Sequence, residues 1–399
     1  MEEERKIRVA ITHGDTNGIG YEVILKTFMD PDILELFTPI IYGSPKAAAY
    51  HKKLLNLPVN FNIISDARDA VDNRVNLLTT FEDEVKIDIG QPSKEAGEAA
   101  LKALDRAMTD YRSDLYDVLV TAPINKDNIQ SDLFKFCGHT EYIEDCIGEG
   151  NKALMILLNG NLRVALVTTH IPIKNVAAAI TKDAVAEKAT ILNQSLRRDF
   201  RISSPRIAVL ALNPHAGDNG VIGDEEQQEI VPAIKQLTDN GILAFGPYPA
   251  DGFFGSGSFR MFDGVLAMYH DQGLAPFKAL AVENGVNYTA GLPIVRTSPD
   301  HGTAYDIAGH GKADESSFRQ AIYTAIDIYR NRIDYDEPLE NPLPKLYHEK
   351  RDDSEKNRFS LPHPKEQFRP DNHPDRKMRQ QAPNTNGNTA PLPSDDENK

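Results

Sequence analysis

The chain has 399 residues, of which 40% are hydrophobic and 26% are charged, so it is long enough for a large core of ordinary globular composition. Its formal net charge of -15 argues against a nucleic-acid binder, because phosphate contacts require clustered Lys and Arg. Two cysteines, Cys137 and Cys146, are too few for a disulfide framework. With neither a signal-peptide pattern nor an apolar run of roughly 18 residues, we expect a cytoplasmic protein without a membrane partner.

Apolar runs typical of strands alternate with segments of helical periodicity along most of the chain. The expected strands cover residues 7–12, 39–42, 115–120, 154–158, 162–168, 206–212, 242–245 and 265–268. The expected helices cover residues 21–29, 93–112, 183–198, 225–237 and 316–331, with another beginning at residue 45. The turn Asn159-Gly160-Asn161 predicts a hairpin. This alternation predicts an α/β protein with a mostly parallel sheet.

The composition changes at about residue 333. Ten of the 25 prolines lie between Pro338 and Pro393, among many polar residues and few aliphatic ones. Such a segment buries too little apolar surface to offset the entropy lost on ordering. We therefore expect one folded unit over residues 1–332 and a mostly disordered tail over residues 333–399.

Three histidines share one local pattern. His170, His215 and His270 each follow an apolar run that predicts a strand. One such histidine is more often structural, whereas three at the strand ends of one sheet would meet where open α/β sheets bind ligands. Imidazole suits Zn, Co, Mn and similar divalent ions, and three neutral ligands leave coordination positions open for a substrate. The pattern indicates a candidate metal site.

Two cations are candidate ligands for an anionic substrate. Lys278 and Arg296 follow the third histidine, and Arg296 comes directly after the apolar run Leu292-Pro293-Ile294-Val295. Arginine binds carboxylate or phosphate with two donors, and lysine binds as a point charge. In a chain of net negative charge, an anion has to be captured by such a local group of cations.

The glycine-rich turn Gly14–Gly20 raises a different possibility. Its spacing is similar to the cofactor loop of short-chain dehydrogenases. That family also needs a Tyr-xxx-Lys pair on a downstream helix, and the match from Tyr42 to Lys46 contains Pro45 and comes too early. We exclude this family.

A series of long motifs, in one order, carries a more specific resemblance. The motifs are GDxxGIG (14–20), GHTE (138–141), TTH (168–170), LNPHAG (212–217), PAD (249–251), MYHDQG (268–273), GVN (285–287), GLPxxRTSxDHGTA (291–304) and DIAGxGKAD (306–314). Over residues 6–332 the chain resembles the 4-hydroxythreonine-4-phosphate dehydrogenase family of pyridoxal phosphate biosynthesis. Departures from that family at Thr16, Asn17 and Tyr21, and the glycine-rich loop 252–258, are candidates for altering the fit of the substrate.

The resemblance implies a set of site residues. It implies a homodimer in which His170, His215 and His270 bind one divalent ion (Zn, Mg, Co or Mn), with His270 coming from the second subunit. The implied substrate contacts are His139, Thr140, Lys278, Asn287 and Arg296. For the group that takes the hydroxyl proton, the sequence leaves three candidates open, namely Lys126, Asp251 and Asp271.

A narrower resemblance concerns the loop from His301 to Gly309. It is similar to the adenosine-binding loop HGSAPDIAG of isopropylmalate and isocitrate dehydrogenases. The resemblance implies their α/β/α fold, with a cleft between a first subdomain (about 1–125 plus 285–332) and a second (about 126–284). It also implies that NAD is bound by His301, Gly302, Thr303, Ala304 and Asp306.

The family resemblance predicts an NAD-dependent, metal-assisted oxidation of 4-phosphohydroxy-L-threonine at C3. The resulting β-keto acid would lose carbon dioxide to give 3-amino-1-hydroxyacetone phosphate. Two alternatives remain open: a paralogue that oxidises another hydroxy acid, such as a phosphothreonate or a dihydrodiol carboxylate, and a metal-dependent hydrolase or lyase. A hydrolase has no use for an adenosine-binding loop, which favours the dehydrogenase over that second alternative.

Overall fold

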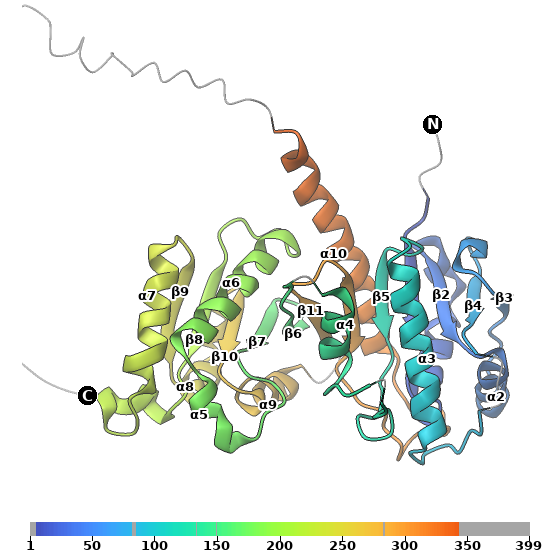
Figure 1. Ribbon diagram of the computed structural model, residues 1–399, viewed down its shortest axis with the longest axis horizontal. Helices are drawn as coiled ribbons and strands as arrows, with labels where there is room; N and C mark the ends of the chain where they lie inside the picture. Colours follow the sequence, from blue (N-terminus) through green and yellow to red (C-terminus); the bar gives the residue numbers. More distant parts are fainter. Residues whose placement is uncertain (1–4, 82–84, 133, 149, 282–283, 343–399) are drawn as a thin grey trace, which may run out of the picture. The chain divides into compact units, whose positions relative to one another are not determined.

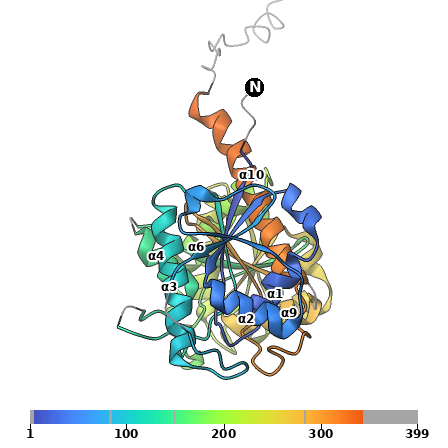
Figure 2. The same ribbon diagram turned by 90° about the vertical axis from the view of Figure 1, so that its right-hand side faces the viewer.

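The computed structural model describes residues 5–81, 85–132, 134–148, 150–281 and 284–342, which lie in one compact unit. They form a 12-stranded sheet with helices on both faces, as Figures 1 and 2 show. The strands are β1 (Arg8–Thr12), β2 (Thr38–Gly43), β3 (Phe61–Ile64), β4 (Val75–Thr79), β5 (Val118–Thr121), β6 (Leu154–Asn159), β7 (Leu162–Leu166), β8 (Arg206–Leu210), β9 (Leu243–Tyr248), β10 (Gly264–Ala267), β11 (Val286–Ala290) and β12 (Val295–Pro299). The α-helices are α1 (Gly20–Thr27), α2 (Pro45–Leu55), α3 (Lys94–Tyr111), α4 (His139–Ile147), α5 (Val176–Ala179), α6 (Lys182–Arg198), α7 (Val231–Asp239), α8 (Ala250–Gly255), α9 (His270–Leu280) and α10 (Ser316–Glu340).

The strands follow the order β3-β4-β2-β1-β5-β12-β11-β6-β7-β10-β8-β9. Neighbouring strands are parallel except around β6 and β11, where the pairs β12–β11, β11–β6 and β6–β7 are antiparallel. The α/β fold with a mostly parallel sheet is therefore confirmed, as is the hairpin at residues 159–161. Strands from residues 1–125 and 285–332 make one side of this order and strands from 126–284 the other. The division into two subdomains at these boundaries remains a prediction.

The interior strands form because their side chains are apolar on both faces. Every residue of β2 and β5 is buried, as expected for parallel strands covered by helices on both sides. The helices bury one stripe each. In α3, Ala96, Ala100, Ala103 and Ala107 recur at helical spacing and are buried, and the Ser93 side chain accepts a hydrogen bond from the Ala96 amide at the helix start.

Helix α9 was not among the helices expected from the sequence. Helix α9 begins at His270 itself, although Gly273 and Pro276 both lower helix propensity. Packing explains the helix. A Cβ added at Gly273 would lie 2.7 Å from Cδ2 of Leu166 and 3.0 Å from Cγ1 of Val164, so glycine allows α9 to pack closely on β7. Tertiary contact therefore outweighs propensity in this segment.

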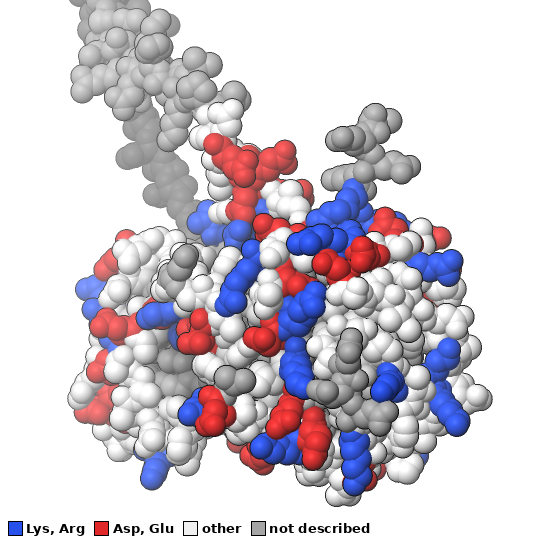
Figure 3. Space-filling view, turned by 45° about the vertical axis from the view of Figure 1, so that its right-hand side comes forward, with Lys and Arg blue, Asp and Glu red and all other residues white. Residues whose placement is uncertain are grey.

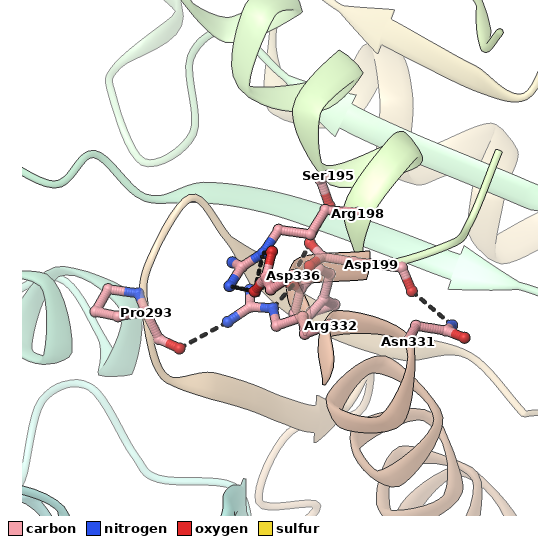
Figure 4. A network of polar contacts seen from close by, with 8 residues as sticks. Ser195, Arg198, Asp199, Pro293, Asn331, Arg332 and Asp336 are labelled. Atoms are coloured by element: carbon pink, nitrogen blue, oxygen red, sulfur yellow. Dashed lines mark hydrogen bonds and ion pairs between the residues drawn. The ribbon is translucent and has the colours of Figure 1, made fainter. Parts of the chain in front are cut away.

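The last helix is longer than expected. Helix α10 continues to Glu340 instead of ending at residue 331, so the beginning of the segment predicted to be disordered is helical. Figure 4 shows the polar contacts that hold it. Arg332 donates to Oδ1 of Asp199 at 2.7 Å and to the carbonyl oxygen of Pro293 at 2.7 Å, and Nε of Arg198 donates to Asp336 at 3.0 Å. These contacts tie a polar helical turn to the core. The rest of the predicted tail, residues 343–399, lies outside the described residues.

The surface carries charges of both signs. On the face drawn in Figure 3, Lys and Arg side chains lie among Asp and Glu side chains, so neither sign covers the face alone. Within the part of the chain that the structure describes, no helix combines the length and the apolar character needed to cross a membrane.

Two buried histidines lie under the N-terminal turn. The ring of Tyr21 stacks between His13 (centroids 5.1 Å apart) and His51 (5.0 Å). Burial lowers the pKa of both histidines from 6.5 to about 4. Both are therefore neutral in the folded protein near pH 6, where the unfolded chain already binds protons at these positions.

We expect the free energy of unfolding to decrease as the pH falls from about 6.5 to 4. The unfolded state binds more protons in that range, and each histidine contributes roughly 3 kcal/mol by this linkage. Replacing His13 by Phe should preserve the stack and remove the His13 contribution. Denaturant titrations at several pH values measure it, with His310→Ala, at an exposed site, as the control. An unchanged pH dependence in His13→Phe would contradict the assignment.

Candidate active site

A cavity of about 280 Å³ lies where several strands end. Its walls come from the segment after β5, the start of α4, the segment after β7, the start of α9, and strands β11 and β12. β5, β7 and β10 all end at this cavity, and such an edge is where open α/β sheets bind ligands.

The cavity gathers most of the residues that the sequence nominated. It is lined by the metal candidates His170 and His270, by all five substrate candidates (His139, Thr140, Lys278, Asn287 and Arg296), by Lys126, and by His301 and Gly302. Asp251 and Asp271 line a separate cavity of about 530 Å³. The remaining candidates, His215, Thr303, Ala304 and Asp306, are not among the lining residues of either cavity.

The two imidazoles in the cavity are close together and each faces a carboxylate. The ring centroids of His170 and His270 are 5.9 Å apart. Nδ1 of His170 lies 3.3 Å from Oε1 of Glu141, and Nδ1 of His270 lies 2.7 Å from Oδ1 of Asp271. Nζ of Lys126 lies 2.9 Å from Nε2 of His170. Both rings thus lie within reach of one small ligand.

His215 is placed differently from the other two histidines. It is exposed and lies in a turn in which six consecutive residues, from His215 to Gly220, have positive φ angles. Four of these residues are not glycine, so the segment is strained. Glu226 fixes the start of the turn by accepting the amides of Leu212 (2.8 Å) and Asn213 (2.7 Å). Among the described residues of one chain, no group of three or more His, Cys, Asp or Glu side chains is arranged to hold a metal ion.

Arg296 is a buried cation held by hydroxyl groups. Its side chain is only 2% exposed. It donates to Oγ1 of Thr121 from Nε (3.2 Å) and Nη2 (2.5 Å), and to Oγ1 of Thr289 from Nη1 (3.2 Å). Burial lowers its pKa to about 10, and the charge of Glu141 partly opposes this change, so the guanidinium is positive at neutral pH. No ion pair between described residues involves Arg296, so its charge is available to an anion in the cavity.

Three further polar side chains line the cavity together with Arg296. Burial, followed by the charges of Arg296 and Lys126, holds the pKa of His139 well below its ordinary value, so this imidazole is neutral. Oδ1 of Asn287 is buried without a hydrogen-bond partner in the described structure. Nζ of Lys278 donates to the carbonyl oxygen of Asp300 at 3.0 Å and is exposed, which leaves it two further donors.

The loop that resembles an adenosine-binding segment is fixed to the N-terminal turn. Its Thr303 carbonyl oxygen accepts the Ile19 amide at 3.0 Å, and the Tyr305 hydroxyl donates to Oδ2 of Asp15 at 2.8 Å. Asp306 is exposed, and no hydrogen bond or ion pair within the described residues involves it. Nε2 of His301 is buried without a partner there, and burial lowers the pKa of this histidine.

The N-terminal glycine turn has a structural role. Asp15, Thr16 and Asn17 are buried, and none of them lines the cavity. Nδ2 of Asn17 donates to the carbonyl oxygen of Gln91 at 2.8 Å, and its Oδ1 accepts the Asp88 amide at 2.9 Å. The departures from the family pattern at Thr16, Asn17 and Tyr21 therefore form part of the core. Of the glycine-rich loop, residues 252–255 belong to α8, and Phe254 lines the 530 Å³ cavity.

Glu141 is the residue that the sequence reasoning missed. It lies in the first turn of α4, lines the cavity and faces His170. Its position within the GHTE motif was the only sequence signal, and a glutamate in a helix is ordinarily a solvated surface residue.

The family comparison fits this geometry. Residues 35–325 match the family described as pyridoxal phosphate biosynthetic protein PdxA. The chain belongs to the PdxA family. This PdxA-family chain is 62% identical, over 354 residues, to the 4-hydroxythreonine-4-phosphate dehydrogenase of Bacteroides thetaiotaomicron, covering 89% of this chain and 97% of the relative. It is 42% identical, over 326 residues, to the enzyme of that name from Sulfurihydrogenibium sp., covering 82% and 99%.

Solved structures with the same enzyme name share the fold. The 4-hydroxythreonine-4-phosphate dehydrogenase of Klebsiella pneumoniae superimposes with a TM-score of 0.69 at 32% identity, covering 81% of this chain and 99% of that chain. The corresponding protein of Burkholderia phymatum gives a TM-score of 0.67 at 35% identity, covering 82% and 99%. The predicted family is confirmed for this PdxA-family chain.

Proposed function

We propose that the chain oxidises 4-phosphohydroxy-L-threonine at C3 with NAD as the acceptor and with the help of a divalent metal ion. The β-keto acid formed then loses carbon dioxide to give 3-amino-1-hydroxyacetone phosphate, a step of pyridoxal phosphate biosynthesis. The names of the relatives and the chemistry of the cavity support this proposal. We further propose that the enzyme is a cytoplasmic homodimer with an active site shared between its subunits.

The observation that carries the proposal is a buried guanidinium beside two imidazoles in one cavity. Arg296 is desolvated and hydrogen-bonded only to hydroxyls, so an anionic ligand is the group that completes its surroundings. His170 and His270 lie in the same cavity. A substrate that carries a phosphate at one end and a hydroxyl near the imidazoles fits both features.

The imidazoles in the cavity are suitable ligands for a divalent ion, but one chain supplies only two of the three proposed histidines. Neutral imidazole is a common ligand of Zn, Co and Mn. One chain brings His170 and His270 to the cavity, while His215 is exposed on a strained turn outside it. We propose that a second chain completes the three-histidine site. The family resemblance implies that the second chain contributes its His270 to the metal site. In the structure, His270 of the same chain already lines the cavity.

The residues of the chain bind the substrate, orient it and move its protons. Arg296 and Lys278 hold the phosphate, and the unpaired Oδ1 of Asn287 accepts a hydrogen bond from a donor group of the substrate. The neutral His139 and Thr140 complete the wall. A bound divalent ion supplies Lewis-acid stabilisation of the oxygen at C3, and bound NAD supplies the hydride acceptor. Of the three candidates for taking the hydroxyl proton, Lys126 lines this cavity and would act as the neutral amine, whereas Asp251 and Asp271 line the other.

One assay tests the proposed function. NADH formation should be followed with 4-phosphohydroxy-L-threonine and, in parallel, with phosphothreonate, before and after removal of metal by a chelator. We expect turnover with 4-phosphohydroxy-L-threonine, with loss on chelation and recovery on addition of metal. Turnover of phosphothreonate alone would identify a paralogous activity. Metal-dependent consumption of substrate without NADH would indicate a hydrolase or lyase.

The proposed adenosine site gives a separate prediction. The exposed Asp306 lies on a loop anchored by Thr303 and Tyr305, so its carboxylate is available to a ribose hydroxyl. Replacing Asp306 by Ala should weaken NAD binding about tenfold or more, because a hydrogen bond to a charged group contributes roughly 1.5–3 kcal/mol. Calorimetry with NAD measures the effect. Unchanged NAD affinity in a folded Asp306→Ala protein would show that this loop only connects β12 to α10.

A further inference from the structure

The tautomer of each imidazole in the cavity follows from its neighbours. An ionised carboxylate only accepts hydrogen bonds, so the nitrogen that faces it must carry the proton. Nδ1 is the nitrogen that faces a carboxylate in both rings, Glu141 at 3.3 Å from His170 and Asp271 at 2.7 Å from His270. Each ring therefore carries its lone pair on Nε2, the nitrogen that a metal ion would bind. In His170 this lone pair faces Nζ of Lys126 at 2.9 Å, so a metal ion would replace that contact.

Lys126 supports the same assignment for His170. Its ammonium group has only donors, and its Nζ lies 2.9 Å from Nε2 of His170. Nε2 must then be the acceptor and Nδ1 the donor. The contacts on opposite sides of the ring thus require the same tautomer.

Glu141 is better placed than Asp271 to hold its histidine. Its side chain is 33% exposed, whereas that of Asp271 is 84% exposed. Water therefore weakens the contact between Asp271 and His270 more than the contact between Glu141 and His170. The backbone of Glu141 is held in the first turn of helix α4, and its other carboxylate oxygen, Oε2, is buried without a hydrogen-bond partner among the described residues.

We propose that Glu141 is a positioning residue that locks the imidazole of His170 in the Nδ1–H tautomer, with Nε2 directed into the cavity, and thereby sets the affinity of the site for a divalent ion. This inference rests on the proposed function, since it concerns the metal site. Carboxylates that orient metal-binding histidines in this way commonly change metal affinity 10- to 100-fold when they are removed.

The test is a titration of the metal-free, full-length protein with Co²⁺. Binding is measured by calorimetry and by the visible absorption of the bound ion. Glu141→Ala should lower the affinity about 10- to 100-fold. Glu141→Gln should lower it less, because the amide oxygen still accepts the Nδ1 proton. Asp271→Ala should also lower it less, because Asp271 is exposed. Saturating Co²⁺ should restore kcat in Glu141→Ala, which a general loss of structure would not allow.

Glu144→Ala is the matched control. Glu144 lies on the same helix, and its carboxylate accepts the Ala153 amide at 3.3 Å instead of facing a histidine. We expect its Co²⁺ affinity to equal that of the unmodified protein. Glu141→Ala and Glu141→Gln proteins that bind Co²⁺ as tightly as the unmodified protein would overturn the role of Glu141 alone. An unmodified protein that binds no Co²⁺ would overturn the proposed metal-dependent function instead.

Discussion

Replacing His170 or His270 by alanine is expected to lower kcat by on the order of 10³-fold. Both rings line the cavity, and their Nε2 atoms are the candidate metal ligands. A bound metal ion stabilises a developing negative charge by several kcal/mol, and each 1.36 kcal/mol of barrier is a factor of ten in rate. The steady-state rate of NADH formation, measured with metal in excess, gives the effect directly.

The controls separate this loss from unfolding. Neither ring is fully buried, since the side chains of His170 and His270 are 29% and 40% exposed, so both variants should keep nearly the unmodified midpoint of thermal unfolding. His310→Ala removes an exposed histidine outside the cavity and should keep full activity. Normal turnover in the variants of His170 and His270 would show that both residues are ordinary structural histidines.

Replacing Arg296 by alanine is expected to raise KM for the phosphorylated substrate by about 10- to 150-fold. The buried guanidinium has hydroxyl partners and no ion pair among the described residues, so a substrate anion is its proposed counter-charge. Each charge-assisted contact contributes roughly 1.5–3 kcal/mol, which corresponds to that range. Substrate saturation curves at fixed NAD and metal measure the change.

Two further variants sharpen this prediction. Arg296→Lys keeps the charge and loses the forked donor geometry, so its KM should fall between those of the unmodified and alanine proteins. Lys278→Ala should have a smaller effect than Arg296→Ala, because Lys278 is exposed and already donates to the Asp300 carbonyl oxygen. Unchanged kinetics in both alanine variants would mean that the phosphate binds elsewhere.

Much of the fold was predictable because burial leaves a clear pattern. Strands β2 and β5 are apolar runs, and α3 repeats alanine at helical spacing. The expected elements did not include strands β3, β4, β11 and β12 or helix α9, and in β12 and α9 polar residues or close packing interrupt the pattern. Strand β12 contains Arg296, Thr297 and Ser298, which are polar yet buried. Helix α9 contains a glycine that only the packing on β7 explains.

The sequence nominated only part of the candidate site, and the site residues remain predictions. The sequence nominated His170, His270 and Arg296, and the structure brings them into one cavity. The sequence did not predict that Asp251 and Asp271 would line a different cavity. Glu141 was missed because its role depends on a spatial contact with a residue 29 positions away.

The most direct test of the account is a crystal structure of the protein with zinc and 4-phosphohydroxy-L-threonine, with the metal located by anomalous scattering. We expect one ion bound at about 2.0–2.1 Å by nitrogen atoms of His170, His215 and His270, drawn from two chains. We also expect the phosphate against the Arg296 guanidinium. An ion without these ligands, or any one of the three histidines more than about 8 Å from the others in the dimer, would contradict the account.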